Sequence, residues 1–114
     1  MKHYMDLYPS PFEKIANGEK TIELRLNDEK RQLINIGDEI EFTNITDSVS
    51  KLYVRVTDIY KFSTFEELYS QLPLDKCGYK PHELSKASPN DMDFYYSEEE
   101  QLKYEALGIK LELI

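Results

Sequence analysis

The stretch GEKTIELR, residues 18–25, decides the fold of this 114-residue chain. It joins a glycine turn to a segment in which apolar and polar side chains alternate. In a strand, Ile22 and Leu24 would lie on one face, and Glu23 and Arg25 on the other, about 7 Å apart at their Cα atoms. The alternation therefore predicts a strand with one apolar and one charged face.

The charged residues of this stretch, Lys20, Glu23 and Arg25, suit a small polar ligand. Arg25 offers a fork of N–H donors, Glu23 accepts from base or sugar groups, and Lys20 supplies a point charge. The simpler interpretation is a solvated strand face with a surface ion pair, which contributes little to stability. Spacing alone favours the simpler interpretation.

Patterns outside this stretch predict four further strands and several short helices. Alternation predicts strands over residues 3–8, 39–43 and 51–62, with a bulge after Asp58, and a closing strand after Gly108. Residues 74–87 look irregular. Helix starts are predicted at Ser10, Thr64, Ser88 and Ser97, three of them followed by a glutamate that completes a capping box.

These elements predict a single α+β domain over residues 1–114. Its architecture is expected to be a small mixed, mostly antiparallel β-barrel with short flanking helices. The apolar side of the strands is expected to form one core. Its members are Ile22, Leu24, Ile40, Phe42, Val54, Val56, Ile109 and Leu111.

Composition narrows the classes of function. The net charge is −8, and residues 32–114 carry all of it, because residues 1–31 hold six basic and six acidic side chains. Such a chain repels phosphate on average, so long duplex DNA is not an expected partner.

No apolar run reaches the ~20 residues of a membrane span. The single cysteine, Cys77, predicts a reduced, cytoplasmic setting, and the two histidines lack the spacing of metal ligands.

The ordered set Gly18-x-Lys20-Thr21-x-Glu23-x-Arg25, followed by the Gly37-Asp38 turn, resembles the signature of ASCH domains. These domains belong to the PUA-like superfamily of small barrels. The resemblance continues through residues 52–56, 65–68, 88–92, 95–97 and 108–111, so it covers nearly the whole chain.

The resemblance implies a cleft beside this motif that binds RNA or nucleotide-like ligands. Some small ASCH proteins hydrolyse the acyl amide of acetylated cytidine, and others are reported as ribonucleases. In the amidohydrolases a lysine at the position of Lys20 acts with a threonine at the position of Glu23 and with a separate glutamate. Lys20 is present here, but Glu23 replaces the threonine, and the separate glutamate has no clear counterpart.

Three hypotheses follow. In the first, the chain binds RNA or a small nucleotide or nucleoside through Lys20, Glu23 and Arg25, with Tyr95 and Tyr96 as candidates to stack on a base. In the second, it is a hydrolase acting on a modified nucleoside or on RNA, with Lys20 and Glu23 as catalytic residues. In the third, it is a protein-interaction barrel with structural charges. None of them requires a metal or another cofactor, or a membrane.

Overall fold

The computed structural model describes all residues, 1–114, and contains one sheet of five strands. The strands are β1 (Lys2–Leu7), β2 (Ile22–Leu26), β3 (Glu39–Asn44), β4 (Lys51–Phe62) and β5 (Ala106–Leu113). The helices are α1 (Pro9–Ala16), α2 (Phe65–Gln71) and α3 (Glu98–Lys103). Four 3₁₀ helices complete the chain: η1 (Arg31–Leu33), η2 (Leu74–Lys76), η3 (Pro81–Lys86) and η4 (Pro89–Phe94).

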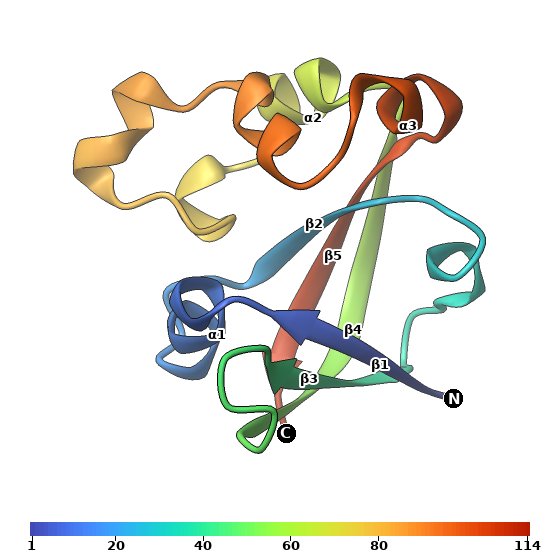
Figure 1. Ribbon diagram of the computed structural model, residues 1–114, viewed down its shortest axis with the longest axis vertical. Helices are drawn as coiled ribbons and strands as arrows, with labels where there is room; N and C mark the ends of the chain where they lie inside the picture. Colours follow the sequence, from blue (N-terminus) through green and yellow to red (C-terminus); the bar gives the residue numbers. More distant parts are fainter.

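The sheet is mixed and mostly antiparallel, and it curls into a half-barrel. Its strand order is β1-β3-β4-β5-β2, in which only the β1–β3 pair is parallel. A register shift between Val56 and Asp58 confirms the predicted bulge in β4. Figure 1 shows the helical segments of residues 65–103 as a layer over one end of the curled sheet, with α1 at its side. The α+β class predicted from the sequence is confirmed.

Side chains bridge the open seam between the two edge strands, β1 and β2. Arg25 on β2 donates from Nη2 to the backbone oxygen of Asp6 on β1, at 2.8 Å. Lys30, in the loop after β2, donates from Nζ to the backbone oxygen of Tyr4, at 2.6 Å. The half-barrel is thus closed here by two cations instead of a backbone ladder.

The buried apolar side chains form two clusters, so the prediction of a single core is wrong. Cluster 1 fills the half-barrel and consists of Met5, Leu7, Phe12, Ile15, Ile34, Ile40, Phe42, Val54, Val56, Leu107, Ile109 and Leu111. Cluster 2 lies under the helical layer and consists of Ile22, Leu24, Leu26, Phe65, Leu68, Cys77, Met92 and Ala106. The split arises because Ile22, Leu24 and Leu26 of β2 pack against α2 and η4 instead of pointing into the half-barrel.

The pairing of β2 with β5 places the charged face of β2 on the inner side of the half-barrel. Glu23 lies opposite Ile109, and Arg25 lies opposite Leu107. Directly opposed residues of paired strands share a face, and both partners on β5 belong to cluster 1. The apolar face of β2 therefore packs against the helical layer, and its charged face does not point to open solvent.

Two of the three helix starts that were predicted from capping boxes are observed in the structure. Thr64 and Ser97 each accept a hydrogen bond from the backbone N–H three residues on, as predicted. The predicted start at Ser10 is wrong: α1 begins at Pro9, after Tyr8, with no side-chain cap. The fixed φ of proline fits the first helical position, so Pro9 starts the helix earlier. None of these helices has the length and apolar character needed to cross a membrane.

The closing strand also begins earlier than predicted. β5 starts at Ala106, and Gly108 lies inside it, opposite Leu24. A Cβ at Gly108 would lie 2.8 Å from Cδ1 of Leu72, at the end of α2. The glycine thus permits close packing of the helical layer on the strand, which is a different role from a turn.

Candidate functional site

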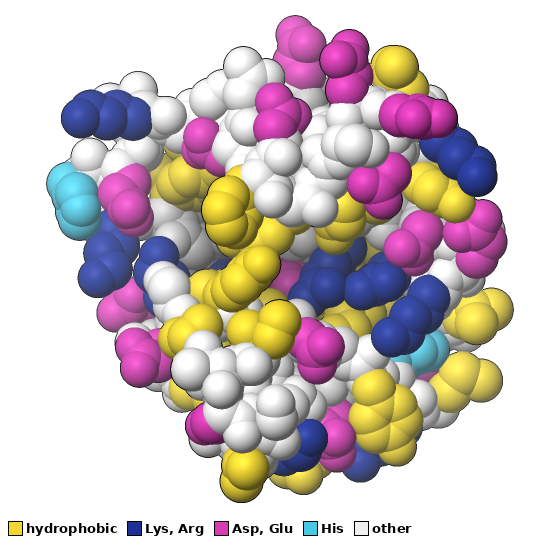
Figure 2. Space-filling model, viewed as in Figure 1, with side chains coloured by type: hydrophobic (Ala, Val, Ile, Leu, Met, Phe, Trp, Pro, Cys, Tyr) yellow, Lys and Arg dark blue, Asp and Glu magenta, His cyan; other side chains and the backbone are white.

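A pocket of about 630 Å³ lies between the half-barrel and the helical layer. Figure 2 shows it as a hollow in the middle of this face, with lysine and arginine side chains inside it. The lining residues come from the end of β1, from α1, from β2 and from residues 69–96. The pocket therefore gathers segments that are far apart in the sequence.

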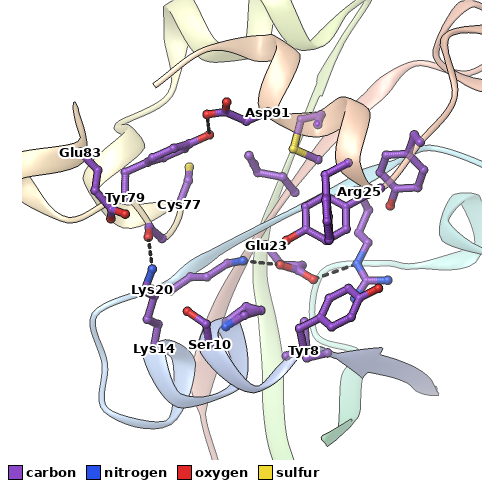
Figure 3. Close-up of a pocket in the computed structure, with 18 of the residues that line it drawn as sticks. Tyr8, Ser10, Lys14, Lys20, Glu23, Arg25, Cys77, Tyr79, Glu83 and Asp91 are labelled. Atoms are coloured by element: carbon purple, nitrogen blue, oxygen red, sulfur yellow. Dashed lines mark hydrogen bonds and ion pairs between the residues drawn. The ribbon is translucent and has the colours of Figure 1, made fainter. Parts of the chain in front are cut away.

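Lys20, Glu23 and Arg25 lie side by side in this pocket (Figure 3). Nζ of Lys20 is 2.6 Å from Oε1 of Glu23, and Nε of Arg25 donates to Oε2 of Glu23 at 2.8 Å. The side-chain exposures are 10% for Lys20, 5% for Glu23 and 14% for Arg25. Spacing alone favoured a solvated surface pair. The structure instead shows a buried cluster of three charged side chains, called here the charged triad.

The charged triad carries one net positive charge. Burial raises the pKa of Glu23, but the charges and hydrogen bonds of Lys20 and Arg25 outweigh burial and lower that pKa to about 2. Burial lowers the pKa of Arg25, and the Glu23 carboxylate more than compensates, so that the net shift is upward. Glu23 is therefore ionised at neutral pH and cannot donate a proton there.

The backbone on either side of the motif fixes the position of Lys20. Its N–H donates to the backbone oxygen of Lys14 at 2.9 Å, and that of Thr21 donates to the backbone oxygen of Lys76 at 2.9 Å. Above them, Gly78 has a φ of +109°, and a Cβ there would lie 3.2 Å from Cδ of Lys20. Glycine at this position thus allows the loop after η2 to lie directly over the lysine side chain.

Donors of the triad remain available to a ligand. Arg25 uses Nε for Glu23 and Nη2 for the backbone of Asp6, and its Nη1 has no partner within the chain. Lys20 has three N–H bonds, of which one points to Glu23. Both oxygens of Glu23 are already engaged, so the pocket floor offers mainly donors, which fit an anion or a carbonyl oxygen.

Three exposed aromatic side chains of the pocket lining, Tyr8, Phe94 and Tyr95, form one cluster, called here the aromatic rim. These side chains are 46%, 75% and 51% exposed. Their ring centroids lie 5.0 to 6.0 Å apart, in edge-on or tilted geometry. Tyr96, the other tyrosine singled out from the sequence, also lines the pocket, but its ring stacks on Phe65 at 6.2 Å. Of the two predicted tyrosines, Tyr95 is thus the freer to meet a ligand.

Sequence reasoning missed the far wall of the pocket. There the hydroxyl of Tyr79 donates to Oδ2 of Asp91 at 2.7 Å, and the hydroxyl of Tyr69 lies 2.7 Å from that of Tyr79. Burial raises the pKa of Tyr69 to about 12, and it also raises the pKa of Tyr79.

Burial also raises the pKa of the Cys77 thiol to about 11, so this cysteine is protonated at neutral pH. Tyr8, Lys14 and Glu83 are further lining residues that no sequence signal marked.

The low pKa of Glu23 predicts a loss of stability in acid. The folded pKa of about 2 lies below the ordinary value of 4.5, so the unfolded chain binds more protons between these values. The contribution of Glu23 is therefore complete above pH 5 and disappears as the pH falls to about 2, a loss of up to about 3 kcal/mol. Asp38 adds to the loss, because hydrogen bonds from His3 and from the backbone N–H of Asn35 lower its pKa to about 2.

Urea unfolding between pH 7 and pH 2.5 measures this effect. The free energy of unfolding of the wild type should fall with pH, and Glu23→Gln should show a shallower fall from its own value at pH 7. Identical slopes for the two proteins would show that Glu23 titrates normally in the folded state.

The chain is similar to known proteins in both sequence and fold. The ASCH domain family model matches residues 5–114, as the resemblance of the motif predicted. The crystal structure of hypothetical protein PH0355 has 34% sequence identity and a TM-score of 0.81, with 100% of both chains covered. Protein PF0455 from Pyrococcus furiosus has 32% identity and a TM-score of 0.72, with 100% of this chain and 98% of that chain covered.

A more distant structure shares the fold alone. The ASCH protein from Zymomonas mobilis has 17% identity and a TM-score of 0.66, with 96% of this chain and 65% of that chain covered. No curated protein matches the chain. From the family match over residues 5–114 and the half-barrel that carries the motif, we conclude that the chain belongs to the ASCH domain family, which has a PUA-like fold.

Proposed function

We propose that the pocket binds RNA or a small nucleotide or nucleoside. The observation that carries the proposal is the buried charged triad in a pocket whose lining also includes a cluster of exposed aromatic side chains. A nucleotide presents the matching pair of features, an anionic phosphate and a flat base.

The charged triad supports binding of the phosphate or of a carbonyl oxygen. Its net positive charge is local, in a chain whose overall charge is −8. The unengaged Nη1 of Arg25 and the remaining N–H bonds of Lys20 are donors of the kind that bind phosphate oxygens. Because Glu23 holds both cations in place, they are already oriented before a ligand arrives.

The aromatic rim supports stacking of a base. Stacking on an aromatic side chain contributes about 1–3 kcal/mol per base in proteins that bind single strands. Tyr8, Phe94 and Tyr95 lie close enough together to present edges and faces to one ring. A pocket of about 630 Å³ and a net acidic surface favour a single unit or a short single strand over a duplex.

The test is a mass-spectrometric screen of nucleosides, nucleotides and short RNAs, followed by calorimetric titration of the best ligand. We expect Arg25→Lys to weaken binding about tenfold although the charge is kept, because the planar fork of donors is lost. Arg55→Lys is the matched control, since Arg55 lies on β4 with 44% exposure and outside the pocket. Unchanged affinity in Arg25→Lys would exclude Arg25 from the ligand site.

Salt and turnover measurements separate the alternatives. With one or two phosphate contacts, the log–log slope of affinity against salt should lie near −1. The hydrolase hypothesis requires a product in the same incubations, formed by wild type and lost in Lys20→Met. If no nucleoside, nucleotide or RNA binds, the proposal fails and the protein-interaction hypothesis takes its place.

A further inference from the structure

A second, smaller pocket of about 300 Å³ adjoins the first. The two pockets share Lys14, Gly78 and Tyr79 in their linings. Beyond these shared residues the second pocket reaches Lys80 in the segment before η3. The two pockets are therefore neighbours on either side of these three residues, and the second offers room beyond the unit that lies on the charged triad.

We propose that this second pocket takes the neighbouring nucleotide of a single-stranded oligonucleotide, with the connecting phosphodiester at Lys14 and the outer phosphate at Lys80. The inference rests on the proposed function of the first pocket and adds the class of ligand, a linear strand of at least two nucleotides.

Lys14 stands where the two pockets meet. Its Nζ donates to the backbone oxygen of Gly78 at 2.8 Å, which fixes the ammonium at the junction and leaves two N–H bonds for a ligand (Figure 3). A phosphate that passes from one pocket to the other would meet this ammonium. Lys80 supplies the only other cation of the second pocket.

The junction is rigid before any ligand binds. Tyr79 lines both pockets, and its hydroxyl is held by Asp91 of η4 and by Tyr69 of α2 through hydrogen bonds of 2.7 Å. The Lys14 bond ties α1 to the same loop. Because these elements are already joined, little side-chain entropy remains to be lost on binding.

The carboxylates of the second pocket limit the strength of the attraction. Glu19 and Asp75 balance the charges of Lys14 and Lys80. Glu83 in the lining of the first pocket adds a further negative charge near both lysines. Glu19 accepts from Nδ2 of Asn17 at 3.3 Å, on the α1 side. The second pocket therefore attracts a short strand by specific contacts and not by a general positive field, and the gain over a mononucleotide should be moderate.

The experiment compares four dinucleotides phosphorylated at both the 5′ and 3′ ends, pApAp, pCpCp, pGpGp and pUpUp, with AMP, CMP, GMP and UMP by calorimetric titration. We expect at least one dinucleotide to bind about tenfold more tightly than its mononucleotide. Lys80→Gln should remove this gain and leave the mononucleotide affinity unchanged. Lys86→Gln is the control, because Lys86 ends η3 outside both pockets.

Each result has a separate meaning. A gain that is lost in Lys80→Gln and kept in Lys86→Gln supports the inference. Equal affinity for every dinucleotide and its mononucleotide, or a gain that survives Lys80→Gln, overturns the inference and leaves the proposed function intact. Absence of binding by all eight probes overturns the inference, and it overturns the proposed function as well when the screen of nucleosides and short RNAs is also negative.

Discussion

Glu23→Gln is expected to lower the free energy of unfolding by about 3–5 kcal/mol at pH 7, the usual cost of removing one partner from a buried ion pair. Glutamine has nearly the shape of glutamate, so no cavity forms. The cost arises because Lys20 and Arg25, at 2.6 and 2.8 Å from the lost carboxylate, are left buried without a counter-charge. Urea unfolding of the variant and the wild type measures the difference.

Glu41→Gln is the matched control for this substitution. Glu41 lies on β3 and pairs with Lys2 at 3.3 Å and with Lys51 at 4.0 Å, where both lysines are about two-fifths exposed. Such a pair is worth less than about 1 kcal/mol, because water replaces the lost partner. If Glu23→Gln costs no more than Glu41→Gln, water must reach the triad freely, and the buried-cluster description is wrong.

Leu68→Ala is expected to cost about 2–5 kcal/mol and to loosen the wall of the pocket that the helical layer forms. Leu68 on α2 is fully buried in cluster 2, which holds this layer on β2. Truncation leaves a cavity between the helical layer and the sheet, in the middle of cluster 2. Since Tyr69, Cys77 and Met92 line the pocket from this layer, a ligand should bind less tightly as well.

Hydrogen exchange tests the local part of this prediction. Amides in residues 65–96 should lose protection in Leu68→Ala, whereas those of β3 and β4 next to cluster 1 should keep more of theirs. Leu102→Ala on α3 is the control, because Leu102 is 82% exposed and should cost little. Uniform loss of protection over the whole chain would show that the two clusters unfold as one unit.

The strands could be predicted because period-2 alternation is a local signal. β4 was predicted from Lys51 to Phe62, as observed, and the change of apolar phase after Asp58 marked its bulge. Alternation could not show which layer covers each face of β2. The apolar face of Ile22 and Leu24 is covered by α2, whose position depends on contacts between residues more than 40 apart in sequence.

The candidate site was only partly accessible from the sequence. Lys20, Glu23 and Arg25 stand close together in the chain, so their spacing and the family signature singled them out. The opposite wall is built from short 3₁₀ helices between residues 74 and 94, which have no apolar period to read. The contact of Tyr79 with Asp91 depends on how these segments fold back, and no local pattern encodes it.

The side-chain bridges between β1 and β2 also affect association between molecules of this protein. An edge strand with free backbone groups can recruit a strand from another chain and so start aggregation. On β1, the outward carbonyls of Tyr4 and Asp6 are already occupied by Lys30 and Arg25. An approaching strand would have to displace both cations, one of which is anchored to Glu23, so an arginine that lines the pocket also protects this sheet edge from pairing with a neighbouring molecule.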